Sequence, residues 1–531
     1  MSEIKPCPNT PDRLALDRRE MIGLGAVVSA ASLLGASAAN AQNQNVIDAA
    51  LEILGDGKTF DAARMGEVAK FLATRPFVPL PNDLPDTYAK LPFDQYAGIR
   101  IKPESSIWNR EGRGFTVEPL HRGFVYGNRV QIFAVEDGVI RRIGYNRNAF
   151  DFGKVPPPAD DQDLGFSGFR VLADGGNGSS WEAAIFQGAT FFRARARNQE
   201  FGVFARTLIL KPADTRGEEV PFFRAFWIDR PTAGSGAMVI NALLDSENLT
   251  GTARFTLRPG EMTITDLEVS LYPRAAVDHV GYGAMTGAFL FGPNDQANTP
   301  DVRVAVYEVK GLQIHNGRGE WIWRPVSNPS NLEISAFVDT NPVGFGLLQR
   351  DRDYASFQDD RQRFDRRPSL WLEPLGEWGA GQVQLIEIPT DSELNDNIIA
   401  YWRPKEPLAA GGEASFACRL YWCWSPPERP AMAVVTGTRV GQAGSGRVTR
   451  FAVDFRADAF SDANLLREAK ATVTATPGKI SKLQLWPYPE RKTLRATFEL
   501  DPGSDPASEL RLVIENAGKP LGETWLYRWT A

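Results

Sequence analysis

The chain has 531 residues, of which 43% are hydrophobic and 23% are charged, and its formal net charge is −6. This composition can fill a folded core, which excludes disordered and collagen-like chains, and the charge provides no basic surface for nucleic acid. Because the whole chain has only three His and three Cys, a zinc cluster, an iron–sulfur site or a c-type haem lacks ligands. We therefore expect no metal and no cofactor, and a chemistry that rests on carboxylates.

Residues 1–41 have the pattern of an export signal. Arg18 and Arg19 precede a mildly apolar run over 22–36, and Ala39-Asn40-Ala41 forms a small-residue cleavage site. The arginine pair and the weak hydrophobicity are typical of twin-arginine signals, which direct export to the bacterial periplasm. The alternative, a membrane anchor, needs about 20 strongly apolar residues, and this run is shorter. We expect a periplasmic protein without a stable membrane anchor.

The mature chain begins with a helical pattern and continues with strands. Met65, Val68 and Leu72 recur at helical spacing within 46–75, and a proline follows. Beyond residue 79, short apolar or alternating runs are divided by Gly, Pro, Asn and Asp, as at 262–271 and 383–388. Since strands and helices do not alternate, we predict an all-β protein built from many antiparallel strands.

A linker rich in Pro and Gly over 403–412 divides two strand-rich regions. The first region, 45–405, has no obvious internal break and predicts one large β-sandwich. The second region, 412–531, has the length and strand count of an immunoglobulin-like sandwich. Its Cys418 and Cys423 lie in one predicted strand, on opposite faces and about 16 Å apart, so we expect no disulfide between them.

The segment 301–402 is dense in carboxylates, Arg and Trp. Sugars offer apolar ring faces for aromatic stacking and hydroxyl groups for charged planar side chains, so this composition favours carbohydrate binding. For each Trp the alternative is packing in a core. The candidate binding residues are Trp323, Arg350, Arg352, Trp371, Glu377 and Trp378.

Hydrolysis of a glycosidic bond requires a carboxylic acid that protonates the leaving oxygen and a carboxylate that activates water. Asp396, which precedes the apolar run Ile398-Ile-Ala-Tyr-Trp402, is a candidate acid because apolar surroundings keep a carboxyl group protonated. The alternative for Asp396 is a turn cap, since Asp next to Asn commonly caps turns.

Seven segments in order resemble the family of periplasmic glucans biosynthesis proteins G and D. They cover nearly all of 46–531, and the twin-arginine signal is more similar to that of protein D. The segments are DQYAGIR (94–100), LGFSGFR (164–170), FFRAFWIDRP (222–231), ALLDS (242–246), NPVGFGLLQRDR (341–352), RPSLWLEP (367–374) and DNIIAYW (396–402).

The resemblance implies a galactose-mutarotase-like β-sandwich followed by a smaller immunoglobulin-like domain. It also implies a role in making osmoregulated periplasmic glucans with β-1,2-linked backbones, and, for members similar to protein D, inverting β-1,2-glucanase activity. The family acid is the Asp of a His-Asp-Asn-Ile motif, which matches Asp396, with Asn395 in place of the His. The family base is the first Asp of His-Asp-Ser-Asp-Gly, which matches Glu308, with Tyr307 in place of the His.

The change from Asp to Glu at 308 keeps the carboxylate but adds one methylene, about 1.5 Å. A misplacement of about 1 Å can cost on the order of 10²-fold in rate. Three outcomes therefore stay open: hydrolysis with an adjusted base, transfer to another sugar, or binding without turnover. In the last case the chain is a glucan-binding partner of the inner-membrane glucosyltransferase. Substitute bases are Asp301, Glu320 and Asp339.

Overall fold

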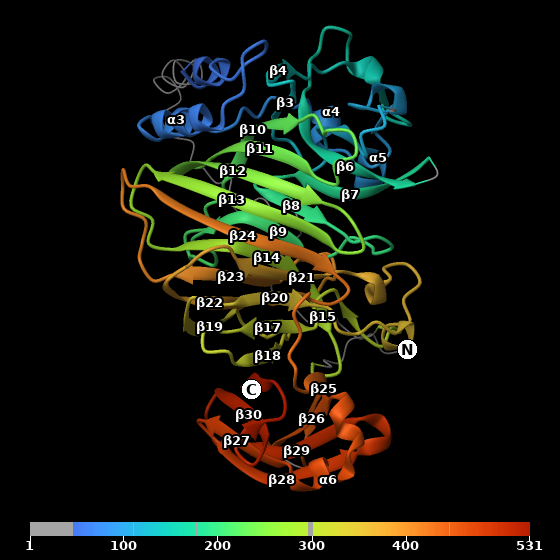
Figure 1. Cartoon of the computed structure of the whole chain (residues 1–531), viewed down its shortest axis with the longest axis vertical. Coiled ribbons are helices and arrows are strands. Elements are labelled where there is room, and N and C mark those ends of the chain that lie inside the picture. The colour runs from blue at the N-terminus through green and yellow to red at the C-terminus, as the bar shows by residue number, and fades with distance from the viewer. Residues whose placement is uncertain (1–45, 110, 177, 296–300, 445) are drawn as a thin grey trace, which may run out of the picture.

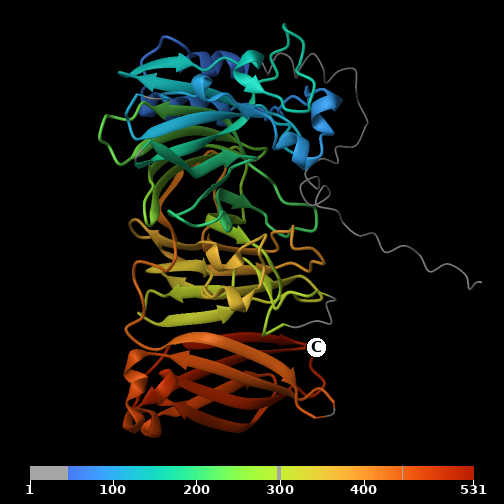
Figure 2. The same ribbon diagram turned by 90° about the vertical axis from the view of Figure 1, so that its right-hand side faces the viewer.

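The computed structural model describes residues 46–531, except 110, 177, 296–300 and 445. The predicted signal at 1–41 lies outside the described residues. Strands dominate the described chain, which confirms the all-β sandwich prediction. Figures 1 and 2 both show an elongated molecule, with the N-terminal helices at one end and the C-terminal strands at the other.

The predicted helical region is divided into two helices. The first covers 46–52, and the second, α3 (Ala62–Ala73), begins after Asp61, whose side chain accepts a hydrogen bond from the Ala63 N–H. The buried face of α3 packs on the sheet, where Thr250 Oγ1 donates to the Ala69 carbonyl. Short helices follow at α4 (Asp86–Ala89), α5 (Phe93–Tyr96) and α6 (Ala463–Glu468).

The larger sheet has fifteen strands within the described residues. It is antiparallel except where β3 pairs with β10 and where β18 pairs with β32. In spatial order the strands are β27 (Lys470–Thr476), β30 (Ala507–Asn516), β32 (Thr524–Thr530), β18 (Trp321–Pro325), β17 (Gly311–His315), β20 (Gly344–Leu348), β21 (Ser369–Pro374), β24 (Ala414–Cys423), β13 (Thr263–Pro273), β12 (Leu249–Arg258), β11 (Met238–Asp245), β10 (Phe222–Asp229), β3 (Gln131–Glu136) and β4 (Val139–Arg142), with β31 (Lys519–Pro520) beside β30.

The second sheet has nine antiparallel strands in the described chain. Its central strand β14 (Val280–Gly287) is buried at every position and contacts β20 of the larger sheet, so the core lies between the two sheets. In spatial order the strands are β19 (Glu333–Thr340), β22 (Ala380–Glu387), β23 (Ile398–Pro404), β14, β9 (Phe204–Leu210), β8 (Phe191–Ala194), β7 (Ser179–Gln187), β6 (Phe166–Gly176) and β2 (Phe115–His121).

The remaining strands form three small sheets. One belongs to the C-terminal unit, which is the part of the chain after β24. Its strand order is β25 (Val434–Gln442), β26 (Thr449–Arg456), β29 (Thr493–Asp501) and β28 (Lys479–Tyr488). Two others are pairs: β1 (Arg100–Ile101) with β5 (Phe150–Asp151), and β15 (Phe289–Phe291) with β16 (Val306–Tyr307). No helix in the described part of the chain is long and apolar enough to cross a membrane.

Strand β24 was expected to be the first strand of the second domain, but it pairs with strands of the first region, 45–405. Strand β24 hydrogen-bonds with β13 on one side and with β21 on the other. The chain therefore passes into the C-terminal unit after β24, because both edges of that strand are already occupied. Its two cysteines, Cys418 and Cys423, are buried and free.

The C-terminal unit joins the larger sheet through β32 and β18. These strands pair in parallel over two residues only, Ile322 with Thr524 and Trp323 with Trp525. The junction is reinforced by the Glu523 carboxylate, which is fully buried and accepts hydrogen bonds from Arg350. Figure 1 shows the resulting arrangement, with the C-terminal strands (red) below β18.

Candidate functional site

The predicted acid, Asp396, lies in the connection between β22 and β23 and is half-buried. Its two neighbours along the chain are buried asparagines that anchor this connection. The Asn397 side chain accepts from the Phe289 N–H at 2.8 Å and donates to the Ile388 carbonyl at 3.0 Å. The Asn395 amide donates to Thr390 Oγ1 at 2.9 Å. The backbone that carries Asp396 is thus anchored on both sides.

The predicted base, Glu308, directly follows β16, and its side chain is 15% exposed. Its backbone N–H donates to the Ala288 carbonyl at 2.8 Å. Its carboxylate Oε1 lies 3.4 Å from the guanidinium Nη1 of Arg367, which is long for a direct charge-assisted hydrogen bond. The carboxylate is therefore close to a positive charge and still partly accessible to solvent.

The segment 287–289 joins the two predicted catalytic positions. At the end of β14, Gly287 pairs with Ile398, two residues after Asp396. The Ala288 carbonyl then accepts a hydrogen bond from the Glu308 N–H, and Phe289 pairs with Tyr307 of β16. The structure thus brings together two chain segments that lie 88 residues apart in the sequence numbering.

Tyr307 occupies the position where the family motif has a His, and it is 2% exposed. Its hydroxyl donates to Asp351 Oδ2 at 2.5 Å, and the other oxygen of Asp351 accepts from Lys310 Nζ at 2.7 Å. Lys310 Nζ also donates to the Thr436 carbonyl in the C-terminal unit. Burial and the Asp351 charge raise the pKa of Tyr307 well above its ordinary value, so this hydroxyl stays a hydrogen-bond donor.

Arg303 ties three acidic segments together near the predicted acid. Its guanidinium contacts Asp301 at 2.7 Å, Asp359 at 2.9 Å and Glu393 at 2.5 Å. Glu393 lies three residues before Asp396, so this network supports the same connection. Hydrogen bonds from Arg303 lower the pKa of Asp301. The Asp301 carboxylate, which was considered as a substitute base, is therefore engaged in an ion pair with Arg303.

The other two substitute bases lie at the far end of the β17–β18 hairpin. Glu320 accepts hydrogen bonds from Thr524 Oγ1 at 2.6 Å and from Arg511 at 2.5 Å. Asp339 accepts from the Gly317 N–H at 2.9 Å. Because Glu308 lies near the beginning of β17 and these residues lie beyond its end, the hairpin separates them from the predicted base.

Two of the predicted sugar platforms are packed in the core between the larger sheet and the C-terminal unit. Trp323 is 1% exposed and Trp371 is fully buried. The Arg350 guanidinium lies 3.5 Å from the centroid of the Trp323 ring, which covers one face of the indole. Neither ring presents a face to solvent. Both tryptophans therefore pack in a core, which was the alternative to sugar binding.

The two predicted binding arginines also contact protein groups. Arg350 forms a two-pronged ion pair with Glu523 at 2.7 and 2.9 Å and donates to the Val435 carbonyl. Arg352 donates to Ser369 Oγ at 3.2 Å and to the Trp424 carbonyl at 3.0 Å. Burial lowers the pKa of Arg352 to about 10. Both side chains hold loops and strands together in this arrangement.

Glu377 and Trp378 line a cavity of about 390 Å³ together with residues of the linker and of the start of β24, between 404 and 416. Trp378 donates to the Ala417 carbonyl at 3.1 Å and remains half-buried. Tyr282, on the same cavity, lies near the start of β14, whereas the predicted catalytic segments meet at its end. Five residues of strand separate these points by about 16 Å, so this cavity is distinct from the Asp396 region.

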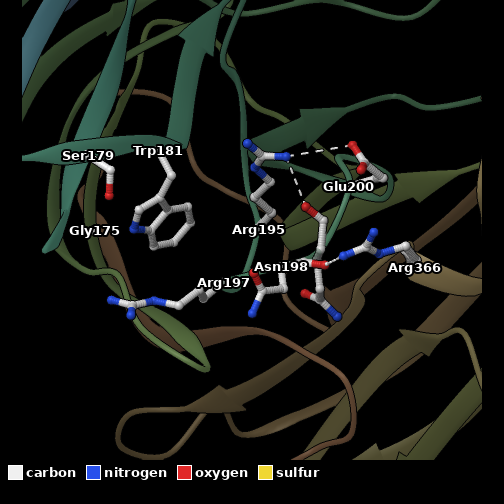
Figure 3. Close-up of a pocket in the computed structure, with 9 residues that line it drawn as sticks. Gly175, Ser179, Trp181, Arg195, Arg197, Asn198, Glu200 and Arg366 are labelled. Atoms are coloured by element: carbon white, nitrogen blue, oxygen red, sulfur yellow. Dashed lines mark hydrogen bonds and ion pairs between the residues drawn. The ribbon is translucent and has the colours of Figure 1, made fainter. Parts of the chain in front are cut away.

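A second cavity of about 300 Å³ is lined by residues within 175–200 and by Arg366, and it was not predicted from the sequence. Figure 3 shows Trp181, Arg195, Arg197 and Arg366 around it. Its wall is connected to the Glu308 region, because the Glu200 N–H donates to the Arg366 carbonyl and the next residue, Arg367, contacts Glu308. The alternation Arg-Ala-Arg-Ala-Arg over 193–197 is the sequence signal that could have indicated it.

Within the described residues, no group of three or more His, Cys, Asp or Glu side chains is arranged to hold a metal ion. The three acids around Arg303 instead share a guanidinium. The region offers carboxylates and guanidinium groups, which suit acid–base chemistry and recognition of hydroxyls and anions.

The architecture and site define an all-β protein with sandwich-like sheets, in which the chain segments of Asp396 and Glu308 both pair with the backbone at the end of the buried strand β14. Residues 60–529 match the family model described as "Periplasmic glucan biosynthesis protein, MdoG". The chain belongs to this family, which confirms the resemblance seen in the sequence.

Curated relatives in several bacteria are similar over most of their length. Each is named "Glucans biosynthesis protein G". The relative from Bradyrhizobium diazoefficiens is 40% identical over 97% of this chain and 100% of its own, and that from Rhodopseudomonas palustris BisA53 is 43% identical over 89% and 93%. The relative from Vibrio cholerae O395 is 40% identical over 89% of this chain and 87% of its own.

Proposed function

We propose that the protein acts in the periplasm on the β-1,2-glucan backbone of osmoregulated glucans, as an inverting glycoside hydrolase or transglycosylase. Asp396 is the general acid that protonates the leaving oxygen, and Glu308 is the general base that activates water from the opposite face of the sugar. The observation that carries this proposal is the meeting of both segments at 287–289.

The surroundings of each carboxyl group suit its proposed role. Asp396 lies between two buried asparagines whose side chains hold the connection in place, directly before an apolar strand. Glu308 Oε1 lies 3.4 Å from Arg367 Nη1, and its side chain is 15% exposed, so the carboxylate is accessible to a water molecule.

The replacement of His by Tyr307 changes how a proton leaves the attacking water. A buried tyrosine whose pKa is well above its ordinary value does not accept a proton near neutral pH. Its hydroxyl is already donated to Asp351. In our proposal Glu308 takes the proton directly, and its extra methylene brings the carboxylate closer to the water than the family Asp would be.

The second candidate is a glucan-binding protein without turnover that assists the inner-membrane glucosyltransferase. The observation in its favour is that Glu308 is an ion-pair partner of Arg367 and that both family His residues are absent. A protein whose Glu308 is paired with Arg367 and lacks the neighbouring His would bind glucan and leave it intact.

The test is incubation of the purified mature protein with linear β-1,2-glucan, followed by size-exclusion chromatography of the products. We expect the glucan to shorten with the wild type and to remain intact with Asp396→Asn, because the amide cannot protonate the leaving group. Asp391→Asn is the matched control, since Asp391 is exposed in the same connection. Intact glucan that binds to the wild-type protein would reject the hydrolase and support the second candidate.

A further inference from the structure

The cavity next to the Glu308 region is lined by side chains from three separate parts of the chain. Trp181 is on β7, Arg195 and Arg197 follow β8, and Arg366 ends the 3-10 helix η4 (Phe364–Arg366). Its volume of about 300 Å³ is at the lower end of the range for small-molecule sites. That size suits one sugar ring with a substituent rather than a long chain segment.

The residues that line this cavity carry an excess of positive charge. Among its nine lining residues three are arginine and Glu200 is the only acid. Arg195 donates to the carbonyls of Glu182 and Gln199, and Arg366 donates to the carbonyl of Asn198. Carbonyl partners orient a guanidinium but do not cancel its charge.

The carboxylates near these arginines are too distant to complete a hydrogen bond. Glu200 lies 3.7 Å from Arg195, and Glu261 lies 3.6 Å from Arg197, with both members of the second pair exposed. Exposed ion pairs of this kind contribute little and are easily exchanged for a ligand. Arg197 is therefore the guanidinium that can turn to an incoming anion.

Trp181 supplies an aromatic ring face for the ligand. Its ring is half-exposed and lines the cavity beside Arg195, as Figure 3 shows. A flat aromatic face beside planar cations fits a ligand that combines an apolar ring face with a negative charge. Neutral glucose would use the ring face and leave the guanidinium groups unmatched.

We propose that this cavity binds a sugar ring that carries an anionic group, either a carboxylate or a phosphate ester, and thereby recognises charged substituents on the glucan. This inference rests on the proposed function, because it takes glucan as the ligand. Arg366 lines the cavity, and the next residue along the chain, Arg367, contacts Glu308, so the same short segment serves both places. The protein thereby distinguishes substituted from bare backbone.

The experiment measures binding by calorimetry to a short β-1,2-glucan oligosaccharide and to the same oligosaccharide half-esterified with succinic anhydride. We expect the anionic ligand to bind about tenfold more tightly, the factor that one charge-assisted hydrogen bond provides. The preference should fall as salt is added. Arg197→Gln should reduce it to the affinity of the neutral ligand, whereas Arg193→Gln, an exposed neighbour that does not line the cavity, should retain it.

Further measurements distinguish a free anion from an anion attached to a sugar. They also test this inference separately from the proposed function. Free succinate and inorganic phosphate should bind far more weakly than the esterified oligosaccharide, and Trp181→Ala should weaken both oligosaccharides. Equal affinity for neutral and anionic oligosaccharide, or a preference that survives Arg197→Gln, would overturn the inference while the binding and shortening of neutral glucan still supported the proposed function. Failure of neutral glucan to bind at all would instead remove the proposed function.

Discussion

The ion pair between Arg350 and Glu523 should contribute much of the stability of the junction between the two units. The Glu523 carboxylate is fully buried and accepts four hydrogen bonds, two from Arg350 at 2.7 and 2.9 Å, one from Gln313 at 2.5 Å and one from the Val435 N–H at 2.8 Å. Glu523→Ala would deprive a nearly buried guanidinium of its carboxylate partner and leave two further donors, from Gln313 and the Val435 N–H, without this acceptor. Removal of one member of a buried pair costs about 3–5 kcal/mol.

The conservative variant and the double variant separate charge from shape. Glu523→Gln keeps the side-chain volume and one acceptor oxygen, and the loss of a hydrogen bond to a charged group costs about 1.5–3 kcal/mol. Arg350→Met with Glu523→Leu removes both charges, so its cost should be smaller than the sum of the single substitutions to Met and Leu. Asp458→Ala, at an exposed ion pair of the same unit, is the control and should leave the unfolding midpoint unchanged.

The assay is urea unfolding followed by tryptophan fluorescence, since Trp323 and Trp525 lie at the junction. The reasoning would be refuted by a Glu523→Ala cost below about 1 kcal/mol, or by additive effects in the double variant. The variant should also affect glucan shortening, because Arg350 precedes Asp351, which holds Tyr307 and Lys310 beside Glu308.

Two further predictions concern buried side chains. Trp323→Ala should destabilise the protein by about 3–5 kcal/mol and leave the glucan affinity of the folded protein unchanged, as equilibrium unfolding and calorimetry would show; a loss of affinity in a folded variant would restore Trp323 as a sugar platform. Burial lowers the pKa of His121 to about 4, so below about 6.5 the unfolded chain binds a proton that the folded chain does not. The free energy of unfolding should therefore fall about 3 kcal/mol more between pH 7 and pH 4 in the wild type than in His121→Gln, and parallel pH profiles for the two proteins would contradict this.

Local pattern was sufficient to predict the strands, because alternation of apolar and polar residues is a property of neighbouring positions. It was not sufficient to assign β24 to its unit. That strand has the composition expected for either sheet, and its place between β13 and β21 depends on partners about 150 and 50 residues earlier in the chain. Pairing over such distances leaves no mark in the strand's own sequence.

The tryptophans of one segment illustrate the same limit for the site. Trp323, Trp371 and Trp378 were all predicted to be sugar-binding residues of one segment, yet the first two are covered and the third lines a cavity. The difference arises because Arg350 and the C-terminal unit cover Trp323, whereas Trp378 lies beside the linker. Exposure of a ring depends on which distant strand packs over it.

The sequence by itself determined the scarcity of His and Cys, the all-β class and the family, since these follow from composition, short-range periodicity and long ordered matches. Only the tertiary structure decided that the Asp396 and Glu308 segments meet at 287–289, and that Arg195 and Arg366 share a cavity. The physical reason is that burial and charge are set by groups that approach through space, from segments far apart along the chain.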